Sequence, residues 1–389
     1  MTGVWPSGPN EATSPPLGAT GGTLTGSSGH EVDMGGVQKA TEPVRVALDA
    51  MGGDHGLEST VAGAARLSLE AAPVRVLLVG NGPAITQALG TMAHDPDWIQ
   101  VVHAADGVVG MDDHPRAALE AAPDCSINVA ARLVQSGNAD ALVSAGSTGA
   151  TILASSEHFQ RLPGVRRAAL AAVYPTEQRH GNKGDPFALM LDVGATLDAT
   201  AEELVGFAVM GAAYARIISD NEHPKVALLS NGTEANKGPP DIVEAHARLA
   251  KLSTVNFHGN IEGLDIPRGT VDVVVCSGFL GNVVLKMLEG VSEVVSDIAR
   301  DAYARKFLWK LGLTMLSQGL QQLRRMTDWK QYGGAPLLGF DHVVIKAHGR
   351  SNAGAIRNAI KVAAKAVERD LAGQIERGLA PVVPAVVSE

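Results

Sequence analysis

The chain has 389 residues, with 41 Asp and Glu against 32 Lys and Arg, which gives a formal net charge of −9 at pH 7. Hydrophobic residues make up 45% and aromatic residues only 4%, which excludes a wholly disordered chain and indicates a core of small aliphatic side chains. The acidic balance argues against a general nucleic-acid-binding protein. Cys125 and Cys276 form no CxxC pair, so a disulfide scaffold and a thiolate zinc site are both disfavoured and a reducing cytoplasm is expected.

Two ends of the chain differ from its middle. Residues 1–30 hold 20 Gly, Pro, Ser or Thr, and Glu11 is their one Asp, Glu, Lys or Arg. So little apolar surface does not offset the entropy of ordering a chain. We therefore expect a disordered tail over 1–43, a folded domain over 44–372 and a second tail over 373–389. No eighteen-residue apolar run and no secretory signal occurs, so a soluble protein is expected.

Short apolar runs predict ten strands in the folded domain. They are Val44–Leu48, Val74–Val79, Ile99–Val102, Ala141–Ser144, Leu170–Tyr174, Ala188–Asp192, Val226–Ser230, Thr254–Phe257, Val271–Val275 and Val343–Ala347. Most lack polar alternation, which is typical of strands covered on both faces. Segments between them, such as 127–134, have the three-four spacing of amphipathic helices. The predicted fold is α/β, with helices on both sides of one large, mostly parallel sheet.

Glycine-rich polar segments follow several of these strands, where a parallel sheet binds its ligands. The first contains Gly52, Gly53, Asp54 and His55, and its glycines let backbone N–H groups approach an anion. An ordinary tight turn is the alternative interpretation.

The second segment contains Gly146, Ser147, Thr148 and Gly149. It is a candidate phosphate cradle without the Gly-Lys-Ser/Thr ending of a Walker loop, and simple helix capping is the alternative.

The third segment contains Asn231, Gly232 and Lys237. Its lysine offers a charge for an anion, although a solvated loop lysine is the more common case.

The fourth segment contains Gly278, Gly281 and Asn282 after Cys276. Its N–H groups are candidates for holding an oxyanion, while the cysteine is better explained as inert packing than as a nucleophile.

The fifth segment spans residues 332–339 and continues, after the last strand, into His348 and Ser351. A histidine at a strand's carboxyl end suits acid–base work or anion contact, and a structural histidine is the equal alternative. We expect all five segments to lie together at one edge of the sheet.

Taken in order, the strings VRVALDAMGGDHG, DALVSAGSTGA, FHGNIEG, VVVCSGFLGNVVLKMLEG, YGGAPLLGF and AHGRSNAGAIRNAI resemble the bacterial phosphate acyltransferases of phospholipid synthesis. The resemblance covers roughly Val44 to Val367. Three positions depart from the family pattern: the segment before Ser126 has Cys125 and no basic residues, Ser277 stands where the family has Asp, and Ala168 replaces a proline.

The resemblance implies an enzyme that moves a long-chain fatty acyl group from acyl carrier protein to inorganic phosphate. The acyl phosphate would then pass to a membrane glycerol-3-phosphate acyltransferase. It also implies a three-layer α/β/α fold with a mixed sheet, related to the phosphotransacetylase and isocitrate dehydrogenase group. A cytoplasmic homodimer that touches an anionic membrane surface peripherally is implied, with no cofactor and no metal.

The chemistry needs few specialised groups. Phosphate is largely dianionic near neutral pH, so it needs positioning more than deprotonation. The leaving thiol has a pKa of about 8.5, so an acid such as His348 or His55 would help, with Lys237 as a phosphate partner. A phosphotransacetylase-like enzyme that uses acyl-CoA and a non-catalytic membrane scaffold remain alternatives. A dinucleotide dehydrogenase is disfavoured because the first segment lacks GxGxxG.

A basic segment lies near the end of the domain. Between residues 300 and 330 there are seven Lys and Arg and two Asp, with apolar residues at helical spacing. This pattern predicts a basic amphipathic helical hairpin that binds anionic lipid or an acidic carrier protein. A hairpin packed in a dimer interface is the alternative.

Overall fold

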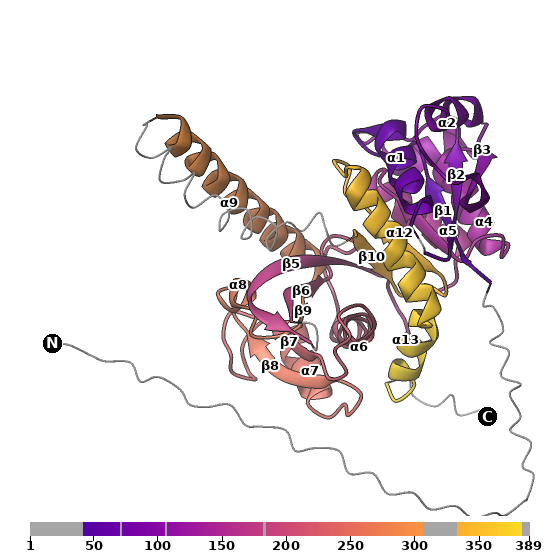
Figure 1. Ribbon diagram of the computed structural model, residues 1–389. Coiled ribbons are helices and arrows are strands. Elements are labelled where there is room, and N and C mark those ends of the chain that lie inside the picture. Colours follow the sequence, from indigo (N-terminus) through magenta and orange to yellow (C-terminus); the bar gives the residue numbers. More distant parts are fainter. Residues whose placement is uncertain (1–41, 71, 106, 182–183, 306–332, 383–389) are drawn as a thin grey trace, which may run out of the picture. The chain divides into compact units, whose positions relative to one another are not determined.

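The computed structural model describes residues 42–70, 72–105, 107–181, 184–305 and 333–382 (Figure 1). Nearly all of the predicted tail over 1–43 lies outside these residues, as does most of the predicted basic hairpin around 300–330. In the described ranges, no helix combines the length and the apolar character that crossing a bilayer requires.

Strands and helices alternate along the described chain. The strands are β1 (Val44–Asp49), β2 (Val74–Gly80), β3 (Ile99–His103), β4 (Ala141–Ser144), β5 (Ala169–His180), β6 (Asp185–Leu191), β7 (Lys225–Leu229), β8 (Asn256–Ile261), β9 (Val273–Val275), β10 (Ala335–Leu338) and β11 (Val343–Lys346). The helices are α1 (Gly56–Ser68), α2 (Gly82–Leu89), α3 (Pro115–Ala121), α4 (Ser126–Gln135), α5 (Thr148–His158), α6 (Ala201–Ile218), α7 (Pro240–Leu249), α8 (Asp265–Arg268), α9 (Gly278–Arg305), α12 (Ala353–Glu368) and α13 (Leu371–Leu379).

All of these strands join one sheet in the order β3-β2-β1-β4-β11-β10-β5-β6-β9-β7-β8. Neighbouring strands are parallel except at three junctions, β11 with β10, β10 with β5, and β5 with β6. The prediction of a large, mostly parallel mixed sheet is therefore confirmed.

Helices cover both faces of the sheet (Figure 1). One buried cluster joins the sheet to α1, α2, α6, α7, α12 and α13, and the other joins it to α3, α4, α5, α8 and α9. The continuous apolar runs of the central strands follow from this burial on two sides. The fold is the predicted three-layer α/β/α arrangement.

The three antiparallel junctions reverse the direction of the sheet. Strands β6, β9, β7 and β8 run opposite to β3, β2, β1, β4 and β11. The carboxyl ends of the two groups therefore lie at opposite edges. The prediction that all five glycine-rich segments share one edge is wrong, because the segments after β7 and β9 leave the sheet at the edge opposite to those after β1, β4 and β11.

Several element boundaries also differ from prediction. Strand β10 lies within the fifth glycine-rich segment and was not among the predicted strands, yet it pairs with β11 and β5. The strand predicted over Thr254–Phe257 is observed as β8, two residues later. The folded body continues past the predicted boundary at residue 372, because α13 buries Leu371, Ile375 and Leu379 against the sheet cluster.

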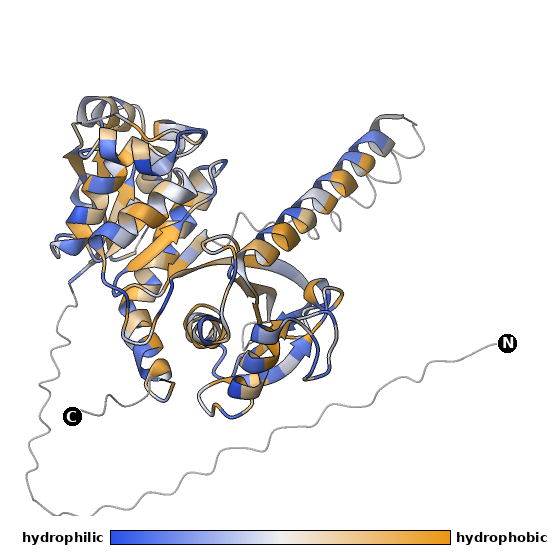
Figure 2. Ribbon diagram, turned by 180° about the vertical axis from the view of Figure 1, so that it is seen from behind, coloured by the Kyte–Doolittle hydropathy of each residue, from blue (hydrophilic) through white to orange (hydrophobic). Residues whose placement is uncertain are grey.

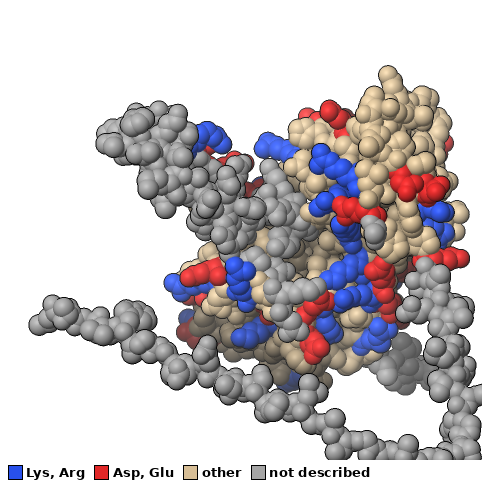
Figure 3. Space-filling model, viewed as in Figure 1, with Lys and Arg blue, Asp and Glu red and all other residues tan. Residues whose placement is uncertain are grey.

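A row of basic residues on α12 ties the two parts of the sheet together. Figure 3 shows Lys and Arg interleaved with Asp and Glu along this helix. Lys361 pairs with Glu70 after α1, and Arg369 pairs with Asp220 after α6. Lys365 Nζ donates to the carbonyl of Ile218 at 2.7 Å and so caps the end of α6. These contacts fix the orientation of α12 relative to both α1 and α6.

Candidate functional site

A buried carboxylate organises the turn after β1. Asp49 is 3% exposed, and its two oxygens accept hydrogen bonds from Ser126 Oγ at 2.6 Å and Ser144 Oγ at 2.7 Å. These bonds join the ends of β1 and β4 to the first turn of α4. A Cβ on Gly52 would lie 2.5 Å from the Gly146 nitrogen, so the first and second segments touch through backbone alone.

The second segment leads directly into α5. Ser147 is the N-cap residue, and its side chain makes no capping hydrogen bond. The first N–H groups of a helix, here those of Thr148 and Gly149, have no acceptor within the helix and carry the positive end of its dipole. This turn can therefore bind an anion through backbone N–H groups.

The fifth segment joins the same edge after β11. The N–H of Asp54 donates to the Gly349 carbonyl at 2.8 Å, and Arg350 Nε lies 4.0 Å from Asp54 Oδ2. Ser351 is buried and follows the same turn. The structure thus brings together the predicted residues of the first, second and fifth segments. His55, at the start of α1, is exposed there.

His348 has a defined tautomer in this turn. The backbone N–H of Arg350 donates to His348 Nδ1 at 3.1 Å. Because Nδ1 accepts, the hydrogen of the neutral ring lies on Nε2. Burial lowers the pKa of His348, with Glu289 opposing and the nearby basic side chains reinforcing the effect. The imidazole is therefore neutral at pH 7, with its hydrogen on Nε2.

Helix α9 extends from the opposite edge of the sheet toward the edge that carries His348. It begins at Gly278 and passes over β5 and β6. Lys286 and Glu289 accordingly lie near enough to His348 to shift its pKa.

Sequence analysis missed Lys346, the last residue of β11. In register it lies beside Ser144, which in turn lies beside Asp49, so the three form one row across the sheet. Lys346 is only 6% exposed. A lysine at a strand end gave no sign of burial in the sequence, because such residues commonly point into water.

The fourth segment packs on a second buried carboxylate at the opposite edge. Asp192 is fully buried and accepts hydrogen bonds from the backbone N–H groups of residues 170, 194, 195 and 196, at 2.6–3.1 Å. A Cβ on Gly281 would lie 1.9 Å from the Asp192 carbonyl oxygen. The N–H of Gly278 donates to Thr196 Oγ1 and that of Gly281 to the Ser277 carbonyl. These N–H groups are already bonded inside the chain, so this part of the fourth segment is explained by packing.

The third segment has its own support, also away from the His348 turn. Asn260 Nδ2 on β8 donates to the Glu234 carbonyl, and Asn260 Oδ1 lies 3.0 Å from Nδ1 of His246 on α7. Asn231 and Lys237 are exposed on this loop. The Asn260 contacts hold the loop in shape, and the structure does not bring Lys237 to the cluster around Asp49.

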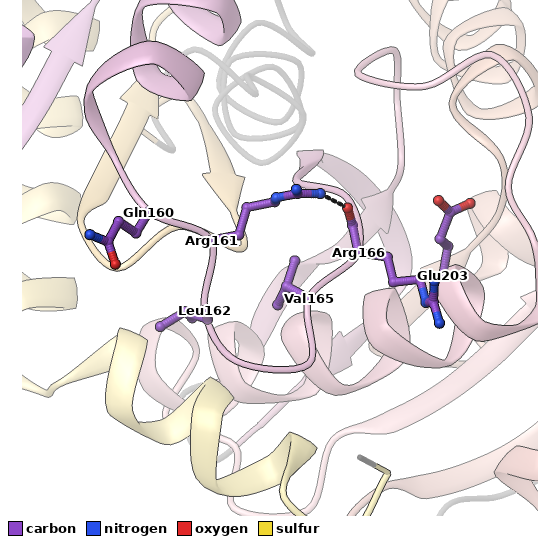
Figure 4. A pocket seen from close by; sticks show the side chains of 6 residues that line it. All are labelled: Gln160, Arg161, Leu162, Val165, Arg166 and Glu203. Atoms are coloured by element: carbon purple, nitrogen blue, oxygen red, sulfur yellow. Dashed lines mark hydrogen bonds between the residues drawn. The ribbon is translucent and has the colours of Figure 1, made fainter. Parts of the chain in front are cut away.

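An open cavity of about 700 Å³ lies between the segment after α5 and the start of α6 (Figure 4). Its lining residues are Gln160, Arg161, Leu162, Val165, Arg166 and Glu203. Arg161 donates to the Arg166 carbonyl, Arg166 pairs with Glu202 at 2.8 Å, and Arg167 pairs with Glu203 at 2.9 Å. The charges of Arg166 and Glu203 are thus balanced by ion pairs with Glu202 and Arg167, while the Arg161 guanidinium is engaged by a backbone carbonyl.

A Thr-His-Asp array near the end of β5 resembles a nucleophilic triad in geometry. His180 Nδ1 lies 2.9 Å from Asp272 Oδ1, and His180 Nε2 lies 3.2 Å from Thr176 Oγ1. The threonine hydroxyl, however, donates to the Gln178 carbonyl at 2.8 Å. Since that proton is directed away from the histidine, the array is structural.

The fold has known counterparts. The phosphotransacetylase from Streptococcus pyogenes superposes with a TM-score of 0.58 at 20% identity, covering 84% of this chain and 95% of that one. The EutD phosphotransacetylase from Staphylococcus aureus gives 0.53 at 16% identity, covering 84% and 94%. The fold and the gathered turns thus define an α/β/α protein of the phosphotransacetylase fold class.

Sequence comparison narrows this class to one family. Residues 44–374 match the family model described as "Fatty acid synthesis protein". The phosphate acyltransferase of Desulfitobacterium hafniense strain Y51 is 44% identical over 337 residues, 86% of this chain and 97% of the relative. That of Nitratidesulfovibrio vulgaris strain DP4 is 41% identical over 324 residues, covering 83% and 91%. The chain belongs to the phosphate acyltransferase family, which confirms the resemblance that the sequence motifs indicated.

Proposed function

We propose that the protein transfers a long-chain fatty acyl group from acyl carrier protein to inorganic phosphate and releases an acyl phosphate for phospholipid synthesis. Membership of the phosphate acyltransferase family supports the transfer to phosphate. The observation that carries the proposal is the convergence of the turns after β1, β4 and β11 around the start of α5. This arrangement supports an anion site of the kind that the reaction needs.

In the proposed reaction a phosphate oxygen attacks the thioester carbonyl carbon. The carbonyl π electrons move to oxygen, and their return breaks the C–S bond, so that a thiolate leaves and an acyl phosphate remains. The N–H groups of Thr148 and Gly149 would bind phosphate together with the backbone at Gly52 and Gly53. Asp49 is a positioning residue, because its bonds to Ser126 and Ser144 hold these turns together.

His348 would stabilise developing negative charge in this reaction. A neutral imidazole with its hydrogen on Nε2 donates a hydrogen bond to the carbonyl oxygen or to the leaving sulfur. This role refines the expectation of an acid or base at His348. His55 lies exposed on the first of the gathered turns, and Lys237 lies exposed on the separate turn after β7, so neither is assigned a catalytic role.

Helix α9 suits a partner surface. Large apolar side chains between 50% and 64% exposed form a stripe along it, visible as orange bands in Figure 2: Phe279, Val283, Met287, Val291, Val294, Val295 and Ile298. Monomeric proteins seldom expose such continuous patches. We propose that this stripe packs against the same stripe of a second copy, as in a homodimer. Light scattering after size exclusion would test this, and a monomeric mass for the unaltered chain would contradict it.

The remaining partners rest on the family resemblance. Acyl carrier protein, a membrane glycerol-3-phosphate acyltransferase and an anionic membrane surface are proposed on that basis. The basic segment that would serve the carrier or the membrane lies mainly outside the described residues. Flotation with anionic and neutral vesicles would test attachment to the surface, and equal binding to both would contradict an electrostatic attachment.

The decisive experiment mixes the protein with palmitoyl-acyl carrier protein and phosphate and detects acyl phosphate and free carrier by mass spectrometry. Both products should appear together and only with phosphate. A parallel reaction with short and long acyl-CoA separates this activity from a phosphotransacetylase-like one. If the carrier thioester stays intact while short acyl-CoA is consumed, the proposed donor is wrong. If neither is consumed, the proposed activity is wrong.

A further inference from the structure

Lys346 is a buried lysine that makes no direct ion pair with a carboxylate among the described residues. It is the last residue of β11 and is 6% exposed. An ammonium has three hydrogens to donate. Among the described residues, its hydrogen-bond acceptor is the carbonyl of Ala347, and no carboxylate oxygen lies within 4.0 Å. Lysines are almost never buried this far unless a negative group is beside them.

The position of Lys346 indicates which negative group would pair with it directly. It shares a row with Ser144 and Asp49, and the Asp49 oxygens accept hydrogen bonds from two serine hydroxyls and from the Met51 N–H. The turns after β1, β4 and β11 start from this row. Lys346 is therefore a cationic residue at the base of the site in which the proposed function places phosphate.

We propose that the Lys346 ammonium binds the attacking phosphate. In the free enzyme this ammonium is the main positive charge of the phosphate site. This inference rests on the proposed function and adds the residue that distinguishes phosphate from water as the nucleophile. A phosphate oxygen accepts a charge-assisted hydrogen bond from Nζ, and the first turn of α5 donates backbone N–H groups. The bound phosphate gives this ammonium the direct anionic partner that the described residues do not provide.

The protonation behaviour of this group is consistent with the geometry. Burial lowers the pKa of Lys346 to about 8, against the opposing effect of Asp49 and Asp54. The neighbouring titratable group on the same turn, His348, is neutral at pH 7. Lys346 is thus charged at neutral pH and loses its charge above about pH 8, so phosphate affinity should fall as the pH rises past that value.

The kinetic test compares Lys346→Met with Lys251→Met, which removes an exposed lysine from the turn after α7. With carrier thioester held constant, KM for phosphate in Lys346→Met should rise roughly ten- to a hundredfold, as expected for losing a charge-assisted hydrogen bond. Lys251→Met should keep the KM of the unaltered enzyme. A KM for phosphate within twofold in Lys346→Met would overturn the proposal.

A second measurement needs no substitution. Inorganic phosphate should raise the Tm of the unaltered protein at pH 7 and do so much less at pH 9.5. An equal rise at both values would overturn the role of Lys346. The two proposals fail separately: an unaltered enzyme that makes acyl phosphate while Lys346→Met keeps its phosphate KM rejects only the lysine. Phosphate stabilisation that follows pH without any acyl phosphate formed rejects only the reaction.

Discussion

Replacing Lys346 by Met should make the protein more stable at neutral pH. In the fold the pKa of Lys346 falls from its ordinary value of 10.5 to about 8, and each pKa unit corresponds to about 1.36 kcal/mol. Keeping this ammonium charged in the folded state therefore costs about 3 kcal/mol. Methionine has a similar length but no charge. It leaves the Ala347 carbonyl without its partner, which returns about 1 kcal/mol of the gain, so the net stabilisation is about 2 kcal/mol.

The pH dependence of this gain has a definite sign. Below about pH 8 the lysine is charged in both states, and the penalty is fully present. Between about pH 8 and 10.5 the unfolded chain binds more protons than the folded one, so the unaltered protein gains stability as the pH rises. The advantage of Lys346→Met should therefore be largest at pH 7 and should disappear by about pH 10.5.

Equilibrium urea unfolding of both proteins at pH 7, 8, 9 and 10 measures this difference. Comparing the two at each pH cancels the titration of all other groups. Lys251→Met is the control, and its difference from the unaltered protein should stay flat. A difference for Lys346→Met that does not change with pH would refute the argument that burial destabilises this ammonium.

Other substitutions test the site and the core. His348→Gln keeps an N–H near the position of Nε2 and should retain activity within roughly tenfold, whereas His348→Phe should lose roughly a hundredfold or more; equal losses would contradict a donor role. On α6, Gly206→Ala should stabilise the protein by about 1 kcal/mol because the added Cβ meets nothing within 4 Å. Gly211→Ala should destabilise it by about 1–3 kcal/mol because the added Cβ would lie 2.6 Å from a Val273 methyl. The urea unfolding midpoints of the two variants compare these effects. Burial would raise the pKa of Asp272, but hydrogen bonds from His180 and its other donors lower this pKa overall. Asp272→Asn should therefore destabilise the protein at pH 7, and the destabilisation should be lost as the pH falls below about 4. Unfolding measured at pH 7 and pH 3 would show this difference.

The local features of the chain were readable from its sequence. Continuous apolar runs such as 44–48 and 141–144 predict buried strands because a strand covered on two faces has no polar side. Glycine-rich turns after those strands are equally visible, since close backbone approach requires glycine, as at Gly52. The ordered series of motifs was enough to indicate the phosphate acyltransferase family.

Only the tertiary structure decided which of these features meet. The reversal of the sheet depends on pairing β10 with β11 and β5, and β10 is a four-residue segment with a proline that has no strand signal of its own. That reversal separates the third and fourth segments from the others. The burial of Lys346 likewise depends on residues distant in sequence, such as its neighbours in the sheet register, Ser144 and Asp49. Pairing and burial of this kind are sums over long-range contacts, and no local pattern contains them.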